Sequence, residues 1–340
     1  MEEITIIRPD DFHVHLRQPE DLSRGTLLPT AQAFGRALVM PNLSPSVLTA
    51  QDALQYKAAI EAALPDLGLR GQFTPLMTIQ IVDATTPETI HEAKSAGVTA
   101  GKLYPVGVTT NSHNGVTDIF ALAEVFREME RCGMVLCLHG ESPGMHCMDR
   151  EKHFLNTLES LVLNFPKLRI VLEHITTVAA VDVVEALPDT VGATITAHHL
   201  LLTLDDVVGD RLQPHNFCKP IPKYYRDRDL LVMVATDAHP KFFFGSDSAP
   251  HRRIDKECDQ GCAGVFSAPS ALALLATIFE KNRSLHTLET FVSKNGAAFY
   301  GLPVNTGTIT LRKEPWRVPE ESYGRLPFMA GKTLPWKLSY

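Results

Sequence analysis

The sequence has few cysteines, no long hydrophobic run and no apolar leader. Its six cysteines in 340 residues are too few for a disulfide scaffold, and none belongs to a zinc-ribbon pair. The longest apolar runs, such as residues 230–235, are far shorter than the roughly 20 residues that span a bilayer. Residues 1–11 are rich in acidic side chains and lack the apolar core of a secretory signal. We therefore expect a cytoplasmic protein with reduced thiols and no membrane partner.

The sequence also has fewer basic than acidic side chains. The 32 Lys and Arg residues stand against 39 Asp and Glu residues, which gives a net charge of −7. A protein that follows nucleic-acid phosphates needs a surplus of positive charge, so this balance argues against a nucleic-acid partner. The H-x-E…P-C-x-x-C pattern of nucleobase deaminases is also absent. The chain does contain 44% hydrophobic residues, enough for a large core, and we expect a globular enzyme.

Short apolar segments alternate with amphipathic stretches along most of the chain. Eight segments have the composition of buried strands: 12–16, 37–41, 73–82, 99–104, 134–139, 169–174, 193–198 and 242–246. Helical periodicity is clearest in 116–132, 181–187, 226–235 and 268–280. Eight such units predict an α/β protein, specifically a (β/α)8 TIM barrel in one domain over residues 1–340. A doubly wound open sheet is the main rival, but no glycine-rich phosphate loop follows the first strand.

Residues from about 302 to 340 differ in composition from the rest of the chain. They are rich in proline and contain both tryptophans, Trp316 and Trp336. They lack the polar bias of a disordered tail. We expect an ordered C-terminal extension that packs on the barrel.

The first predicted strand contains the motif His13-Val14-His15. Side chains two apart leave the same face of a strand, and in a barrel that face is the interior. Two neighbouring imidazoles in a closed cavity suit a divalent metal ion. The motif alone leaves open a second interpretation, in which both histidines lie on a half-exposed edge strand.

Four more predicted strands end in a chemically active side chain: Lys102, His139, His174 and Asp247. The intervals along the chain are multiples of one strand–helix unit, which places these residues and His15 on strands one, four, five, six and eight. Burying one unpaired ionisable group costs several kcal/mol, so four such placements require a common partner. Each residue alone could be structural, as a core histidine, a helix cap or a surface lysine. Together they predict a metal centre at one mouth of the barrel.

Lys102 is the unusual member of this set, because an ammonium group has no lone pair and repels cations. A deprotonated lysine that adds CO2 becomes a carbamate with two anionic oxygens, which can bridge two metal ions. His13 and His15 would bind one ion, and His139 and His174 would bind the other. The residues therefore predict a two-metal centre that is bridged by carboxylated Lys102.

Such a centre predicts a hydrolytic reaction. A hydroxide shared by two metal ions is acidified into a nucleophile at neutral pH. Asp247 would bind one ion, accept the proton of this hydroxide and return it to a leaving nitrogen. The expected chemistry is cleavage of an amide bond.

Six motifs occur in one order along the chain and together resemble the amidohydrolase superfamily. They are DFHVHLR at 11–17, MPN at 40–42, GKLYP at 101–105, HGE at 139–141, LEHI at 172–175 and GSDSAPH at 245–251. GCAG at 261–264, after DSAPH, narrows the resemblance to the dihydroorotase family of the single-function bacterial type. The resemblance implies a TIM barrel, two Zn2+ ions per subunit, a carboxylated lysine and a homodimer. It also implies interconversion of N-carbamoyl-L-aspartate and L-dihydroorotate in de novo pyrimidine biosynthesis.

The resemblance also assigns a role to each matching position. The metal ligands are His13, His15, His139, His174, carboxylated Lys102 and the catalytic Asp247. The side chains that would bind the substrate carboxylate are Arg17, Asn42 and His251. Arginine suits this role because its guanidinium can form two parallel hydrogen bonds to a carboxylate. His15 and His139 would contact the substrate as well. Without the resemblance, Arg17 fits a substrate ligand and an ion-pair partner equally well, whereas Asn42 is more typical of a turn and His251 of a surface histidine.

Backbone groups and a loop complete the implied substrate site. Lys219 and Ala263 would contact the pyrimidine ring through their main chain, although an apolar residue is common at the position of Lys219. Thr109 and Thr110 match a loop that closes over the substrate, and an ordinary surface loop is the alternative. Glu141 follows one of the histidine ligands closely and is a candidate for supporting it.

Two other functions share parts of this pattern. A hydantoinase or allantoinase has the same kind of metal site but little use for a carboxylate clamp or for the DSAPH histidine. A non-catalytic homologue that serves as an assembly partner for another pyrimidine enzyme typically lacks metal ligands, and none is missing here. The sequence therefore favours a zinc-dependent hydrolase of a carboxylated cyclic amide.

Overall fold

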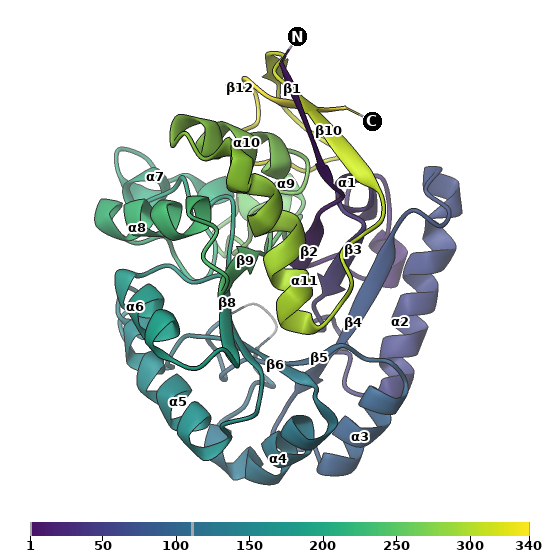
Figure 1. Ribbon diagram of the computed structural model, residues 1–340, viewed down its shortest axis with the longest axis vertical. Coiled ribbons are helices and arrows are strands. Elements are labelled where there is room, and N and C mark those ends of the chain that lie inside the picture. The colour runs from purple at the N-terminus through teal and green to yellow at the C-terminus, as the bar shows by residue number, and fades with distance from the viewer. Residues whose placement is uncertain (1, 110–111, 340) are drawn as a thin grey trace.

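Eight parallel strands form one sheet that follows the order of the sequence (Figure 1). The computed structural model describes residues 2–109 and 112–339. The strands are β2 (Asp10–Val14), β3 (Arg36–Val39), β4 (Thr74–Ile81), β5 (Ala100–Leu103), β6 (Val135–His139), β7 (Ile170–Glu173), β8 (Val191–Ile195) and β9 (Phe242–Phe244). Each one overlaps a segment that the sequence predicted as a strand. The differences are confined to the ends, and the last strand has three residues in place of the five expected.

The sheet closes into a barrel because β9 returns to β2. The Asp247 N–H donates to the His13 carbonyl at 2.9 Å, and the His15 N–H donates to the Ser248 carbonyl at 3.0 Å. An isolated parallel bridge joins Val14 to Ser248. A strand order without reversal excludes the open doubly wound sheet, whose order reverses at a switch point. The predicted TIM barrel is confirmed.

Helices surround the barrel on its outer side (Figure 1). They are α1 (Leu27–Ala33), α2 (Ala50–Ala63), α3 (Pro87–Ser95), α4 (Ala123–Cys132), α5 (Arg150–Asn164), α6 (Val178–Ala186), α7 (Asp205–Val208), α8 (Tyr225–Thr236), α9 (Arg253–Lys256), α10 (Ala271–Lys281) and α11 (Asn295–Tyr300). Their ends follow local chemistry. Thr49 and Asp52 form a reciprocal capping box at the start of α2, and Gly133 ends α4 in the left-handed conformation.

The interior of the barrel is filled by apolar side chains. Phe12 stacks on Tyr300 with ring centroids 4.7 Å apart, and Phe243 meets Phe12 edge-on at 5.6 Å. These rings belong to a cluster distinct from the larger core between strands and helices. Because apolar residues fill the barrel, its polar side chains gather at the carboxyl ends of the strands, where active sites of this fold lie.

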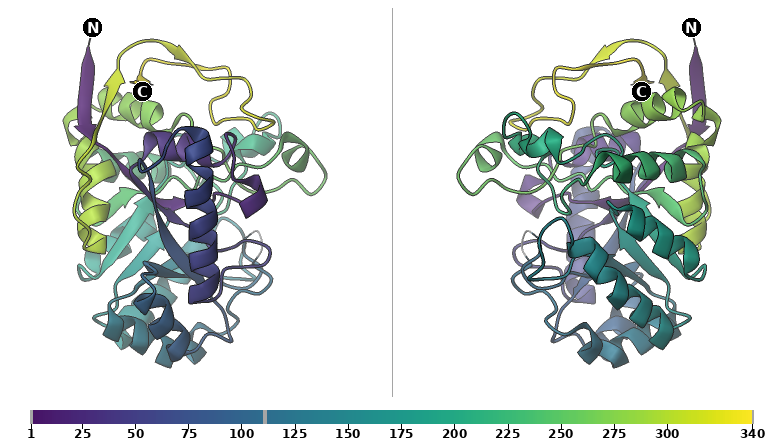
Figure 2. Two further views of the ribbon diagram at one scale, coloured as in Figure 1. Left: turned by 90° about the vertical axis from the view of Figure 1, so that its right-hand side faces the viewer. Right: turned by 90° about the vertical axis from the view of Figure 1, so that its left-hand side faces the viewer.

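The two ends of the chain meet in a small antiparallel sheet. Its strands are β1 (Glu3–Ile7), β10 (Thr308–Arg312) and β13 (Lys337–Ser339), and β11 (Trp316–Arg317) pairs separately with β12 (Thr333–Leu334). Figure 2 shows both ends of the chain at one end of the molecule. Trp336 is buried, and its Nε1 donates to Glu280 on α10 at 3.0 Å. The tail therefore packs on the barrel, together with an N-terminal strand that the sequence analysis did not predict.

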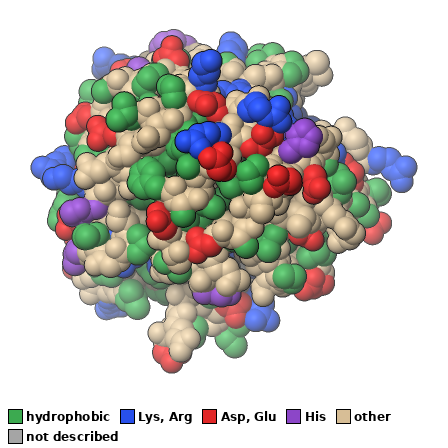
Figure 3. All heavy atoms as spheres, turned by 90° about the horizontal axis from the view of Figure 1, so that it is seen from below, with side chains coloured by type: hydrophobic (Ala, Val, Ile, Leu, Met, Phe, Trp, Pro, Cys, Tyr) green, Lys and Arg blue, Asp and Glu red, His purple; other side chains and the backbone are tan. Residues whose placement is uncertain are grey.

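Lys, Arg, Asp and Glu side chains intersperse on the face that Figure 3 shows. Within the described residues, every helix is too short or too polar to cross a bilayer.

Candidate metal centre and substrate cavity

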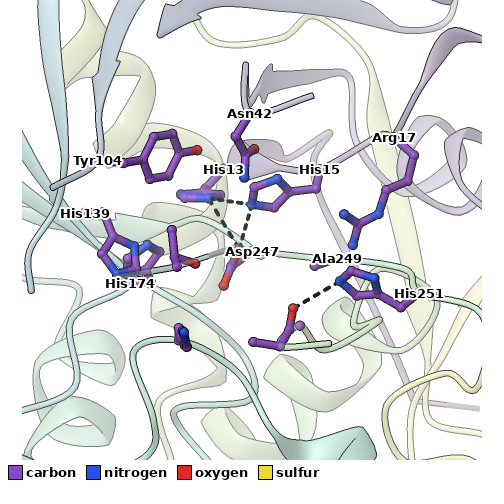
Figure 4. Close-up of a pocket in the computed structure, with 14 residues that line it drawn as sticks. His13, His15, Arg17, Asn42, Tyr104, His139, His174, Asp247, Ala249 and His251 are labelled. Atoms are coloured by element: carbon purple, nitrogen blue, oxygen red, sulfur yellow. Dashed lines mark hydrogen bonds and ion pairs between the residues drawn. The ribbon is translucent and has the colours of Figure 1, made fainter. Parts of the chain in front are cut away.

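Three of the predicted ligands converge at the seam of the barrel. His13 lies in β2, His15 follows that strand, and Asp247 follows β9. The two Nε2 atoms are 3.3 Å apart, and Asp247 Oδ1 lies 3.3 Å from His13 Nε2 and 3.2 Å from His15 Nε2 (Figure 4). Two imidazole nitrogens and one carboxylate oxygen at such separations fit the ligand set of a divalent transition metal. These residues form a candidate metal site.

The predicted histidines of the other strands lie beside this group. The His174 ring centroid is 5.0 Å from that of His13 and 4.8 Å from that of His139. The Nε2 atom of His139 lies 2.7 Å from Glu141 Oε2, so Glu141 contacts the histidine that it was expected to support. Burial and neighbouring positive groups hold the pKa of His13 and of His174 well below 6.5. Both rings are therefore neutral, the form that binds a metal ion.

Lys102 is fully buried in β5, beneath these histidines. Its Nζ contacts Glu173 Oε2 and lies 4.9 Å from the centroid of the Tyr104 ring. Removal from water lowers the pKa of Lys102 to about 7. A large fraction of this amine is therefore neutral at physiological pH, and a neutral amine is the form that can add CO2.

Glu173 is a member of this cluster that the sequence analysis missed. It is the last residue of β7, and its Oε2 lies 3.0 Å from His13 Nδ1 in addition to its contact with Lys102. With His13 and His174 it forms a second group of potential metal ligands. The available signal was a glutamate in an otherwise apolar strand. The metal-ligand role at this strand end was assigned to His174, the next residue, instead.

Three residues of the site have a left-handed backbone conformation, which residues other than glycine rarely adopt. The φ angles are 72° at Arg17, 44° at His174 and 43° at Asp247. Each such residue costs of order 1–3 kcal/mol and persists only where the surroundings enforce it. All three follow a barrel strand directly or within a few residues. The turn of the chain at these points directs each side chain into the centre of the barrel mouth (Figure 4).

One cavity is lined by the predicted metal-site residues other than Lys102 and by most of the predicted substrate ligands. Its lining includes the predicted residues His13, His15, Arg17, Asn42, Thr109, His139, His174, Lys219, Asp247, His251 and Ala263. Thr110 lies outside the described residues. Tyr104, Ala249 and Gly264 also line the cavity and were not predicted as site residues. Of these, Tyr104 belongs to the GKLYP motif, which was the signal that could have identified it.

One part of the cavity carries an uncompensated positive charge. The Nε of Arg17 donates to the Pro250 carbonyl at 2.8 Å, whereas its Nη2 is buried and has no hydrogen-bond partner among the described residues. Burial lowers the pKa of Arg17 to about 10, so the guanidinium stays charged at neutral pH. Beside it, His251 Nε2 lies 3.0 Å from the Ala263 carbonyl (Figure 4). A buried cation with a free donor has the chemistry that suits an anionic group.

Comparisons with known proteins agree with this geometry. The amidohydrolase family matches residues 5–319. A dihydroorotase from Teredinibacter turnerae is 48% identical over 98% of this chain and 98% of that protein. The crystal structure of a dihydroorotase from Campylobacter jejuni is 38% identical, with a TM-score of 0.91 over 100% of this chain and 98% of that one. The chain belongs to the dihydroorotase family of amidohydrolases.

A second solved dihydroorotase bears on the ligand. The enzyme from Saccharomyces cerevisiae, crystallised with 5-fluoroorotic acid, is 34% identical to this chain. The two have a TM-score of 0.92, and the match covers 100% of this chain and 99% of the yeast chain. This relative of the family therefore binds a carboxylated pyrimidine. Membership of the dihydroorotase family favours a cyclic-amide hydrolase over a nucleobase deaminase, whose motif this sequence lacks.

Proposed function

We propose that this protein catalyses the reversible hydrolysis of L-dihydroorotate to N-carbamoyl-L-aspartate, a step of de novo pyrimidine biosynthesis. The observation that carries this proposal is the content of one cavity, in which a group of metal-type ligands lies with a buried arginine that has a free N–H donor. A cyclic amide with a ring carboxylate complements both features. A neutral hydantoin or allantoin ring would leave the arginine without a partner.

The residues present fit two Zn2+ ions. His13, His15 and Asp247 supply ligands for one ion, and His139 and His174 supply ligands for the other. Lys102 would bridge them after carboxylation, in line with its burial and its lowered pKa. When bound, zinc supplies Lewis-acid polarisation of the amide carbonyl and lowers the pKa of a coordinated water.

Asp247 is the group that we assign to proton transfer. Its Oδ1 is within 3.3 Å of Nε2 of both His13 and His15, so the carboxylate lies beside the imidazoles that would hold one metal ion. As the new C–O bond forms and the ring C–N bond breaks, the Asp247 carboxylate accepts the water proton and passes it to the departing nitrogen. The reverse sequence closes the ring.

The remaining residues of the cavity orient the substrate. The side chains Arg17, Asn42 and His251 bind its carboxylate, while the main chain at Lys219 and Ala263 contacts the ring. We assign Thr109 and Thr110 to a loop that closes over the cavity. On the strength of the family, we also propose a homodimer in the cytoplasm.

The deciding experiment follows the loss of ultraviolet absorbance as the zinc-supplied protein opens L-dihydroorotate, with hydantoin and allantoin measured beside it. We expect turnover of L-dihydroorotate alone. The Arg17→Ala variant should lose at least 100-fold in kcat/KM, because it removes a charge-assisted pair worth about 3 kcal/mol. Turnover of only the neutral rings would refute the substrate assignment while retaining the metal site. No turnover of any ring by zinc-loaded, bicarbonate-treated protein would favour the non-catalytic homologue.

A further inference from the structure

We propose that Tyr56 is a positioning residue, which sets the affinity for the substrate carboxylate by holding the backbone of Arg17. Tyr56 lies on α2, outside the cavity lining, and no sequence motif pointed to it. The proposal rests on the proposed function, because it assumes that Arg17 binds the carboxylate.

The first observation is the backbone of Arg17. Its φ of 72° is unfavourable for a residue with a Cβ atom, so this conformation requires a stabilising interaction with another part of the chain. The Tyr56 hydroxyl supplies one, since it donates to the Arg17 carbonyl at 2.5 Å. This bond fixes the peptide that follows Arg17 and, through it, the direction of the side chain.

The second observation is the state of the guanidinium. Nε donates to the Pro250 carbonyl, and Nη2 is buried without a hydrogen-bond partner in the described part of the chain. Arg17 is thus held at its backbone by α2 and at its side chain by the loop after β9. The buried Nη2 amino group, with its two N–H donors, is left for an anion. If the backbone hold were lost, the guanidinium would be free to turn about its bond to Pro250 and misalign this donor.

The third observation is that Tyr56 is a rigid donor. Its ring is buried on the inner face of α2, beside the buried residues Ala53 and Ile60, and the helix begins at a capping box. Burial raises the pKa of the Tyr56 hydroxyl above its ordinary value, so the hydroxyl keeps its proton throughout the working pH range. A firmly anchored helix therefore presents a permanent donor to Arg17.

The test is Tyr56→Phe, which keeps the ring and removes only the donor. Binding of 5-fluoroorotate and of 5-fluorouracil to the zinc-loaded protein is measured by calorimetry or by competitive inhibition. The two rings differ by the carboxylate. We expect affinity for 5-fluoroorotate to fall about tenfold, the usual effect of one lost hydrogen bond, and affinity for 5-fluorouracil to stay within twofold. The KM for L-dihydroorotate should rise by a similar factor with kcat little changed.

Two controls separate positioning from general damage. Tyr225→Phe removes another tyrosine hydroxyl, one that donates to Asp205 on the surface, and should leave both affinities unchanged. In an Arg17→Ala background, Tyr56→Phe should cause no further loss of kcat/KM, because the residue through which it acts is gone. Equal weakening of both ligands, an unchanged affinity for 5-fluoroorotate, or an additive effect in the Arg17→Ala background would overturn the proposal. Failure of the wild-type protein to bind 5-fluoroorotate would instead refute the proposed function.

Discussion

The backbone N–H of Asp247 donates to the carbonyl of His13 at 2.9 Å, while the side chains of the same two residues approach to 3.3 Å. The contact that closes the last barrel strand onto the first is therefore also part of the candidate metal site. Any change that loosens this seam moves two metal ligands relative to each other. Stability of the barrel and affinity for the metal should be coupled here.

Asp11 is the side chain that holds the seam together. Its carboxylate accepts from the N–H of His13 at 3.2 Å, from the N–H of Ser246 at 2.7 Å and from the Ser246 hydroxyl at 2.5 Å. Asp11→Ala leaves these buried donors without an acceptor, and we expect the free energy of unfolding to fall by about 3 kcal/mol. Urea denaturation of the metal-free protein measures this. The exposed Asp259→Ala serves as a control that should change stability by less than about 0.5 kcal/mol. A loss below about 1 kcal/mol for Asp11→Ala would show that the seam does not depend on this carboxylate.

The barrel was predictable from the sequence because its strands are buried on both faces. A strand such as 134–139 is almost wholly apolar, so a polar residue at its end, here His139, is conspicuous. The order of such residues along the chain then indicates which strands they end. The structure brings His13, His15, His139, His174 and Asp247 to one cavity, whereas Lys102, which the same argument placed with them, lies outside its lining in contact with Glu173.

Features that depend on distant partners were not predictable. The strand Glu3–Ile7 is a short segment whose partner, Thr308–Arg312, lies at the other end of the chain, and nothing local marks the pair. Tyr56 fits the apolar face of an ordinary helix, and the partner of its hydroxyl, the carbonyl of Arg17, lies far away in the sequence. The left-handed backbone at Asp247 also follows from closure of the barrel and not from local sequence.

Glu173 should control how tightly the first metal is held. Its Oε2 lies 3.0 Å from His13 Nδ1, and a carboxylate at this position favours the tautomer that leaves the Nε2 lone pair for a metal ion. Glu173→Gln removes the negative charge beside His13 Nδ1, and we expect zinc affinity to fall about 10- to 100-fold. Competition with a chromogenic chelator measures the affinity without reference to activity. Glu159→Gln, an exposed change on α5, is the matched control. Unaltered zinc affinity in Glu173→Gln would exclude a role of this carboxylate in metal binding.

Carboxylation of Lys102 should depend on pH with a midpoint far below that of an ordinary lysine. Burial lowers the pKa of the amine from 10.5 to about 7, and only the neutral amine reacts with CO2. The neutral fraction of the metal-free protein therefore rises as the pH increases through about 7. NMR of protein incubated with isotopically labelled bicarbonate detects the carbamate directly. Lys102→Met should abolish the signal, activity and one of the two metal equivalents, whereas the exposed Lys152→Met should retain all three. Full activity of Lys102→Met would exclude the bridging carbamate.

Binding of a carboxylated ring should take up a proton at His251. Because a carbonyl can only accept, His251 Nε2 must donate to the Ala263 oxygen, and in the neutral ring Nδ1 then carries a lone pair. A lone pair repels a carboxylate, so His251 can bind this group only as the imidazolium. Burial, followed by the charges of Arg17 and Lys256, lowers the pKa of His251 to about 2 in the free protein, so the proton must come from solvent on binding.

The sign of the pH effect follows from this linkage. A ligand that binds the protonated form binds more tightly as the pH falls, by up to about tenfold per pH unit between the pKa of His251 in the free protein and its higher pKa in the complex. Calorimetry of orotate binding in two buffers of different ionisation enthalpy should show proton uptake near neutral pH, whereas uracil, which lacks the carboxylate, should show none. His251→Asn offers a neutral amide donor and should bind orotate with much less proton uptake and a flatter pH profile. Orotate binding to the wild-type protein without proton uptake would mean that His251 meets the ligand as a neutral ring, with its hydrogen bond to Ala263 exchanged for another.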